Sequence, residues 1–508
     1  MTFKQLLSVF LISVCALSAS AQESENIVLQ PCRRGTFRYD RLHRRAGQEQ
    51  DRGPGGDYFT GTKHQLVVLA SFADNPFMGD EAATLAKWDT ILNTVQLNQP
   101  PFVGSLRDYF YDQSYGQFDL VFDLQFVQVD SCSRYRSTMT DDENSQYLVQ
   151  DIMDTLRLRT IEWDRYDWNG DSYVNQLLII FAGQGSAYGH MGPSYNAIWP
   201  HQWWLSMHLK DRQQGVYCSP DTICYQGADF IVDAYCAVQE LSSDSTYGTF
   251  GTICHEYTHC FGFPDFYGYS GKVIGEWDLM DSGNYNENGF RPTGFSAHER
   301  WIMGWLTPVE LTESTTVTGM PALTDQPVAY LIRNDAYPNE FYMLENRQQE
   351  GWDAALPGSG LTVFHIDYDP EIWLTGEANT NNQKHYTLIP ANNSTATYYN
   401  SGWAYPYVSG GIVNNALTNT SEPAATLWHA NTDGTKLMSK PVTDISVTDG
   451  LVSFSFMAAP EPITNITFPP VDDEQSPAGA QARKVFRNGN LYILLGDKTY
   501  TLQGQVLR

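Results

Sequence analysis

Apolar runs of strand length alternate with helical stretches along the first three hundred residues. Such runs predict buried β-strands at residues 65–72, 118–122 and 173–183. Residues 105–113 open with a serine suited to cap a helix, and residues 147–158 follow a helical apolar period, so we expect helices there. The alternation predicts a first domain of mixed helices and strands over residues 63–310.

After this domain the pattern changes to short runs rich in Thr and Val that Gly, Pro and Asn interrupt. Residues 361–366 and 451–456 are examples, and the pattern predicts a β-rich, sandwich-like domain over residues 311–458. Residues 459–481 are rich in Pro and polar side chains, which is typical of a linker. The tail, residues 482–508, is expected to form small hairpins. The predicted fold class is therefore α+β.

The amino terminus carries the features of a secretory signal peptide. An apolar run at residues 6–17 follows Lys4 and ends before the small residues 19–21, which form a cleavage pattern. The run is shorter than the roughly 20 apolar residues of a transmembrane helix, and no later segment is apolar enough to span a bilayer. Residues 1–21 are therefore predicted to be removed, and the protein is expected to be secreted.

The segment that follows, residues 22–62, is basic and shows no sustained apolar period. We interpret it as a pro-segment, which would make the protein a zymogen. The alternative is an irregular amino-terminal extension without a processing role. Candidate processing sites are the pair Arg44-Arg45 and the Gly-rich run at residues 53–56.

Composition and charge narrow the functional classes. The 508 residues are 42% hydrophobic, enough for ordinary buried cores, and the formal charge of -27 disfavours nucleic acid and anionic lipid as partners. Without the signal peptide, seven of the eight cysteines remain, in a compartment that permits disulfide bonds. The pairings left open are Cys218 with Cys224, and Cys236 with Cys132, Cys254 or Cys260.

The motif His255-Glu256-Tyr257-Thr258-His259 carries the strongest chemical signal in the chain. On a helix, residues four apart lie on one face, so the two histidines can present their imidazoles to one metal ion. Glu256 lies beside the first ligand and can act as general base towards a metal-activated water. The motif therefore predicts a catalytic zinc site, with His255 and His259 as ligands.

A third zinc ligand is expected shortly after the motif. Gly262 allows the chain to leave the helix without a Cβ clash, and Asp265 then falls where that ligand is needed. Three protein ligands leave one coordination position open, as catalytic zinc requires. The alternative is a later glutamate, for which Glu276 and Glu299 are candidates.

Downstream, Met280 lies in a turn flanked by glycines. This resembles the Met-turn that forms a hydrophobic floor under the zinc site of metzincin peptidases, although a lone methionine is usually core filler. Tyr285 is near enough in sequence to be a possible oxyanion donor that stabilises the transition state.

Several separated motifs are similar to the immune inhibitor A-like family of secreted metzincin-type zinc metallopeptidases. They are Asp108-Tyr109-Phe110, Ile198-Trp199-Pro200-His201, the zinc motif through Pro264-Asp265-Phe266-Tyr267, the Met280 turn, and Leu344-Glu345-Asn346-Arg347. The resemblance spans roughly residues 63–457. It implies a secreted endopeptidase with a removable pro-segment and a β-rich domain after the catalytic one. Two departures are the short pro-segment and a tail outside the family pattern.

A second cation site is predicted in a loop where side-chain oxygens recur at alternate positions. The candidate calcium ligands are Asp167, Asn169, Asp171, Tyr173 through its carbonyl, and Asn175. The loop lacks the closing glutamate of an EF-hand, so a polar turn before a strand is the alternative. His201, His365 and His385 are expected to be structural histidines, and Glu345 and Arg347 a structural pair.

The sequence thus predicts a zinc endopeptidase, with calcium as a second ion, that cleaves extracellular proteins or peptides. We expect a monomer that is secreted, with retention at the cell surface through the tail as one option. Cys32, if unpaired, is one candidate for the ligand that keeps the zymogen latent, through its thiolate, and the acidic residues of the pro-segment are the others. Two other classes stay open: an inactive binding protein on a zinc-peptidase fold, and a zinc hydrolase for glycan or peptidoglycan.

Overall fold

The structure is a computed structural model, and it covers most of the chain beyond the predicted amino-terminal segments. The residues that it describes are 59–135, 144–185, 198–205, 209–211, 216–217, 221–242, 246–268, 271–374, 376, 378–457, 483–487, 490–495, 498–500 and 506–507.

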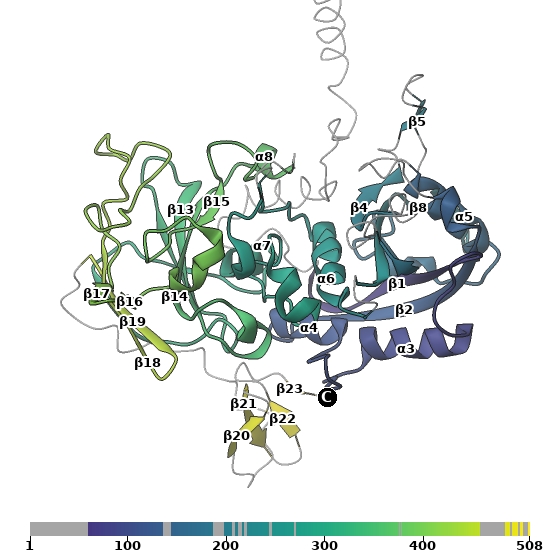
Figure 1. The fold of residues 1–508 in the computed structure, drawn as a ribbon, viewed down its shortest axis with the longest axis horizontal. Helices are drawn as coiled ribbons and strands as arrows, with labels where there is room; N and C mark the ends of the chain where they lie inside the picture. The colour runs from purple at the N-terminus through teal and green to yellow at the C-terminus, as the bar shows by residue number, and fades with distance from the viewer. Residues whose placement is uncertain are drawn as a thin grey trace, which may run out of the picture.

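A five-stranded sheet forms the centre of the first half (Figure 1). In spatial order its strands are β2 (Phe118–Val129), β1 (Gly61–Phe72), β3 (Leu177–Gln184), β9 (Ala234–Leu241) and β4 (His201–Trp204). The first four strands run parallel, and β4 pairs antiparallel with β9 at the edge. Long stretches of β1 and β3 are buried at every position, as expected for a parallel sheet covered on both faces.

Four α-helices pack against this sheet. They are α3 (Glu81–Asn93), α4 (Leu106–Gln113), α5 (Ser145–Leu156) and α6 (Phe250–Thr258). The first three contact β2, and α6 contacts β9. The predicted helices at 105–113 and 147–158 are confirmed as α4 and α5, and Ser105 caps α4 together with Asp108 in a capping box.

Strand β1 begins before the predicted start of the first domain. It starts at Gly61, and Phe59 is already in the core, with its ring 5.1 Å from that of Phe261 and 6.3 Å from that of Phe118. The predicted boundary after residue 62 therefore lies inside a strand. Residues 1–21 and most of the predicted pro-segment lie outside the described residues, as does the linker at 459–481.

Two sheets form the second half: a mixed sheet of five strands and an antiparallel sheet of three strands. The five-stranded sheet has the order β10 (Val309–Glu310), β12 (Ala329–Arg333), β13 (Glu340–Arg347), β14 (Gly360–Asp367) and β15 (Tyr386–Leu388). The three-stranded sheet has the order β11 (Thr315–Met320), β19 (Leu451–Phe456) and β18 (Val442–Thr448). The two sheets contribute to one hydrophobic core.

The five-stranded sheet of the second half also packs against the first half. Along β13, Tyr342 and Leu344 belong to the core between the two sheets, whereas Phe341 and Met343 belong to the core of the first half. This alternation follows from the two-residue period of a strand. Helix α7 (Ala297–Ile302) contacts β13 from the first half. The first core therefore extends across the predicted domain boundary at residue 310.

Smaller elements complete the described part of the chain. Short strand pairs are β5 (Leu209–Asp211) with β6 (Val216–Tyr217), β7 (Asp221–Tyr225) with β8 (Ala228–Val232), and β16 (Tyr407–Ser409) with β17 (Ile412–Asn414). In the tail, β20 (Arg483–Arg487), β21 (Asn490–Leu495), β22 (Lys498–Tyr500) and β23 (Val506–Leu507) form an antiparallel sheet. The remaining helices are α8 (Pro370–Leu374) and the 3₁₀ segments η2 (Cys132–Arg134), η3 (Trp163–Tyr166), η6 (His259–Phe261), η7 (Gly275–Trp277), η8 (Gly283–Gly289), η9 (Gly351–Ala355) and η10 (Thr397–Gly402).

The structure bears on two further sequence predictions. None of the five cysteines that it describes forms a disulfide bond, so the pairings of Cys236 with Cys132, Cys254 or Cys260 are not seen; Cys218 lies outside the described residues. No helix in the described part of the chain is long and apolar enough to cross a membrane.

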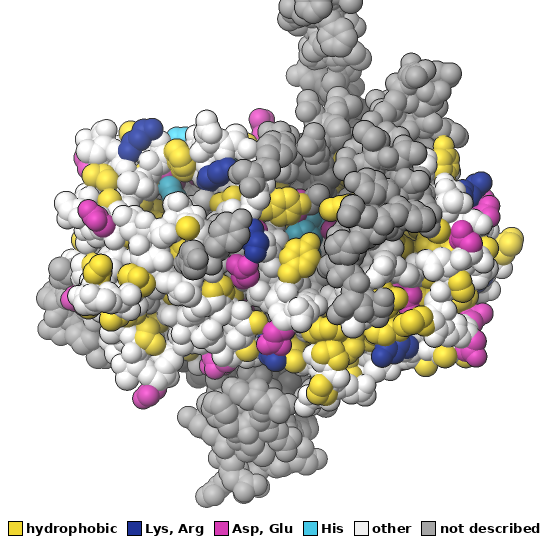
Figure 2. Space-filling model, viewed as in Figure 1, with side chains coloured by type: hydrophobic (Ala, Val, Ile, Leu, Met, Phe, Trp, Pro, Cys, Tyr) yellow, Lys and Arg dark blue, Asp and Glu magenta, His cyan; other side chains and the backbone are white. Residues whose placement is uncertain are grey.

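On the face shown in Figure 2, acidic side chains are spread over both halves and do not form one patch.

Candidate metal centre

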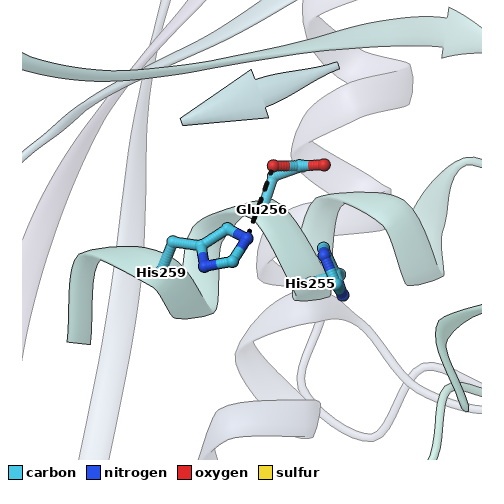
Figure 3. A group of neighbouring side chains, drawn as sticks. All are labelled: His255, Glu256 and His259. Carbon is cyan, nitrogen blue, oxygen red and sulfur yellow. Dashed lines mark ion pairs between the residues drawn. The ribbon is translucent and has the colours of Figure 1, made fainter. Parts of the chain in front are cut away.

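Helix α6 brings the two motif histidines together at its carboxyl end. His255 lies in the last turn of α6, and His259 opens the 3₁₀ segment η6 that continues it. Their ring centroids are 5.0 Å apart, because the residues are separated by about one helical turn (Figure 3). His255 is 4% exposed and His259 is fully buried, so water does not solvate these rings freely.

Backbone carbonyl groups hold both imidazole rings from behind. Nδ1 of His255 donates to the carbonyl oxygen of Leu279 at 2.8 Å, and Nδ1 of His259 donates to that of Phe263 at 2.7 Å. A carbonyl oxygen can only accept, so the proton lies on Nδ1 in both rings. In the neutral rings, Nε2 therefore carries the lone pair that can bind a metal ion.

Asp265 returns to the two histidines after a sharp bend. Gly262 has a left-handed backbone, with φ of 96°, that side chains rarely adopt, and it ends η6. Oδ1 of Asp265 then lies 3.1 Å from Nε2 of His255 and 3.5 Å from Nε2 of His259. Two ligand atoms on a tetrahedral zinc ion are separated by about 3.3 Å. The spacing of these three atoms therefore suits a zinc ion.

Glu256 lies beside His259 in the same cluster. Its Oε2 lies 3.9 Å from Nε2 of His259, and the carboxylate projects towards that ring (Figure 3). Among the described residues, the group of His255, Glu256 and His259 is the only one whose side-chain ligand atoms all lie within 4.8 Å of one another. Glu256 thus belongs to the cluster, and Asp265 lies closer than Glu256 to both imidazoles.

Two buried polar atoms of this cluster are unsatisfied. Nε2 of His259 and Oε2 of Glu256 are buried and have no hydrogen-bond partner in the described structure. Burial disfavours the charged form of His255, but the Asp265 carboxylate beside Nε2 and the charge of Glu256 outweigh it and favour the protonated ring, which raises the pKa of His255. A buried lone pair and a concentration of negative charge both fit a bound divalent cation.

The Met280 turn supports the cluster from the next segment of the chain. Met280 is fully buried, and its amide donates to Oδ1 of Asp278 at 2.8 Å, which closes the turn. Leu279, in the same turn, supplies the carbonyl group that fixes His255. The carbonyl oxygen of Met280 accepts the amide of Phe266 at 2.8 Å, directly after Asp265. The turn thus holds both His255 and the segment of Asp265.

The other predicted site residues are placed as follows. Tyr285 lies in η8, which packs against α6 so closely that a Cβ on Gly251 would be 1.9 Å from the carbonyl oxygen of Asn284. Tyr285 is 53% exposed, and its role as an oxyanion donor stays a prediction. The alternative ligands bond elsewhere: Glu276 accepts from Lys272 and Asn400, and Glu299 caps α7.

In the predicted calcium loop, side-chain oxygens accept hydrogen bonds from the loop itself. Asp167 accepts the amides of Asp171 and Ser172, and Asp171 accepts the amide of Tyr173 and the side-chain amide of Asn169. Oδ1 of Asn175 accepts the amide of Trp168. These bonds shape a compact polar turn, and calcium binding there stays a prediction.

The structural roles expected for other residues are confirmed. His201 bonds to the carbonyl oxygen of Trp199 at 2.6 Å and to the hydroxyl of Tyr235 at 3.0 Å. Arg347 donates to Glu345 at 2.9 Å, with both side chains fully buried. Sequence reasoning missed the carbonyl groups that orient the histidines, because a backbone carbonyl leaves no trace in residue type.

Part of the chain is similar to known proteins. Residues 93–305 match the family described as immune inhibitor A peptidase M6, catalytic domain. This segment is similar to a peptidase catalytic domain. It contains α6, Asp265 and the Met280 turn, so the resemblance seen in the sequence motifs is confirmed.

A curated relative agrees with the family match. The chain is 28% identical over 152 residues to immune inhibitor A of Bacillus thuringiensis subsp. alesti. The matched part covers 27% of this chain and 21% of that protein, so the chain spans about a fifth of the relative's length.

Proposed function

We propose that this protein is a zinc-dependent endopeptidase that cleaves extracellular proteins. His255, His259 and Asp265 are the zinc ligands in this proposal, and Glu256 is the general base. One observation carries it: Nε2 of both histidines meets Oδ1 of Asp265 within 3.5 Å, while Nδ1 of each ring is tied to a carbonyl oxygen. Zinc supplies, when bound, a Lewis acid that polarises a peptide carbonyl and acidifies a water molecule.

Glu256 is suited to move the proton that peptide hydrolysis requires. Its Oε2 has no hydrogen-bond partner in the described structure and lies next to His259, so it can accept a proton from the attacking water. The same oxygen then returns the proton to the leaving amine. Both carboxylates of the site are largely buried, which strengthens these interactions by excluding bulk water.

The finer assignments belong to this proposal as well. The support that the Met280 turn gives to His255 favours a metzincin-like site, and the sandwich-like description of the second half is favoured by the core between its two sheets. Secretion rests on the predicted signal peptide. A monomeric state, a zymogen form and retention through the tail rest on the sequence alone.

Zinc content and casein cleavage, measured on the mature protein, test the proposal. Glu256→Gln should bind zinc normally and lose about 10²–10⁴-fold in rate, because a general base contributes that much. Asp265→Ala should lose zinc, whereas Glu276→Gln, which changes the alternative ligand, should keep both zinc and activity. A wild type that binds no zinc, or a Glu256→Gln variant as active as wild type, would exclude the mechanism.

A further inference from the structure

A tyrosine of the second half contacts two different supports of the metal centre. Tyr386 opens β15, which lies beside β14 in the half drawn on the left of Figure 1. It is fully buried, although it lies far along the chain from the zinc motif. Its ring and its hydroxyl group each meet a segment that borders the metal cluster.

The ring of Tyr386 fixes the residue that follows the third predicted ligand. It stacks on Phe266, with ring centroids 3.8 Å apart and planes inclined by 20°. Asn379 joins the same two residues: its side-chain amide donates to the carbonyl oxygens of Phe266 at 2.7 Å and of Tyr386 at 2.6 Å. Phe266 is therefore held by its ring and its carbonyl group, and Asp265 is its immediate neighbour.

The hydroxyl group of Tyr386 reaches the turn that orients His255. It donates to Oδ2 of Asp278 at 3.3 Å, and it shares a hydrogen bond of 2.6 Å with Oγ of Ser296. Oδ1 of the same Asp278 accepts the amide of Met280 and so closes the turn that presents the carbonyl group of Leu279. Burial, with the charges of Asp278 and Glu299, raises the pKa of Tyr386, so the hydroxyl keeps its proton.

We propose that Tyr386 is a positioning residue for the metal centre, acting on Asp265 through Phe266 and on His255 through the Asp278 turn. This inference rests on the proposed function. Two zinc ligands on different segments share one support, so the distance between them depends on the second half of the chain. Outer partners of metal ligands typically change metal affinity by about 10–100-fold when they are removed.

The test compares Tyr386→Phe with a matched control, Tyr342→Phe. Tyr342 is also a buried tyrosine of the same sheet, but its hydroxyl donates to the carbonyl oxygen of Thr426 at 2.6 Å, in the core of the second half. Zinc affinity is measured by competition with a chromophoric chelator, and the melting temperature is measured on the zinc-free proteins. These readouts separate the metal site from general stability.

We expect Tyr386→Phe to raise the zinc dissociation constant about tenfold, with a loss in zinc-free melting temperature no larger than that of Tyr342→Phe. The absorption spectrum of the Co²⁺-loaded protein should also change in Tyr386→Phe alone, because it reports ligand geometry. Phe266→Leu, which removes the ring stack and keeps an apolar side chain, should weaken zinc binding in the same way and carries the test if Tyr386→Phe does not fold.

The positioning role is wrong if folded Tyr386→Phe binds zinc with an affinity within twofold of wild type. It is also wrong if Tyr386→Phe and Tyr342→Phe lose equal amounts of zinc affinity. The wild type is measured in the same assay. If the wild type binds no zinc, the proposed function itself fails. If the wild type and Tyr386→Phe bind zinc equally well, only the positioning role fails.

Discussion

Two groups of histidine and carboxylate side chains lie in the two halves of the molecule, and their polar atoms are paired differently. In the metal centre, Nδ1 of each histidine bonds to a backbone carbonyl and Nε2 of His255 lies 3.1 Å from Asp265, while Nε2 of His259 and Oε2 of Glu256 have no hydrogen-bond partner in the described structure. In the second half, the histidines bond to carboxylates. We call this second group the β-half cluster; its members are Glu340, His365, Asp367, His385 and His429.

The carboxylates of the β-half cluster are saturated with donors. Oε1 of Glu340 accepts from His365 at 2.8 Å, and Oε2 accepts the amide of His429 at 2.9 Å. Asp367 receives His385 and His429, each at 3.1 Å. Similar residue types therefore build a candidate metal site in one half and a hydrogen-bonded structural network in the other. A histidine lone pair beside two carboxylates suits a divalent cation, whereas a closed network of donors and acceptors stabilises the fold.

Exchanging one histidine in each group should give the largest contrast. His259→Ala removes a predicted zinc ligand. Zinc affinity and the rate of casein cleavage should therefore fall by more than the roughly 10–100-fold that is typical when an outer partner of a ligand is removed. His365→Ala should keep the activity of each folded molecule but destabilise the protein by about 3 kcal/mol, because it breaks a buried pair. Activity assays and urea unfolding measure the two effects. If His365→Ala abolishes zinc binding, the contrast between the groups is wrong.

The pH dependence of stability should sharpen the comparison with a smaller effect. Burial disfavours the charged form of His385, but its bonds to Asp367 outweigh this and raise its pKa; the same bonds, with that of Gln383, lower the pKa of Asp367 against burial. His385 contributes to the free energy of unfolding below its unfolded pKa of about 6.5, and this contribution is lost as pH rises through the higher pKa of the folded state. Asp367 contributes above its unfolded pKa of about 3.9, and its contribution is lost as pH falls through the lower pKa of the folded state.

Wild type and His385→Gln, both zinc-free, should therefore differ most in melting temperature between about pH 4 and 6.5. The difference should shrink on either side of this range. Thermal unfolding followed by circular dichroism from pH 3 to 9 provides the measurement. A difference that does not vary with pH would show that His385 contributes through packing and not through its charge.

Calcium should have the smallest effect. If the loop at residues 167–175 binds the ion, added calcium should raise the melting temperature by about 2–4 °C, and Asp171→Asn should abolish this rise. The control is Asp164→Asn, which changes an exposed acidic residue in the neighbouring η3 segment. An equal rise in wild type and Asp171→Asn would place the effect elsewhere, and no rise would leave the loop as the polar turn that its own hydrogen bonds describe.

Local sequence was sufficient for the helix-borne part of the site and for several elements. The spacing of His255 and His259 places them on one face because helical periodicity acts over a single turn, and Ser105 caps α4 through its own neighbour Asp108. Strand starts were less certain: β1 begins at Gly61, because pairing with β2 extends it beyond its apolar run. Helix α3 has a weaker apolar pattern and was missed.

The third predicted ligand shows where local information ends. The position of Asp265 depends on the left-handed backbone of Gly262, which residue type favours, but its distance to His255 is set by Phe266 and its partners. Residue spacing predicts which chemistry a segment can offer, because it acts through neighbouring backbone bonds. Tertiary structure alone brings the carbonyl group of Leu279 to His255 and the ring of Tyr386 to Phe266, because these contacts arise only when distant segments pack together.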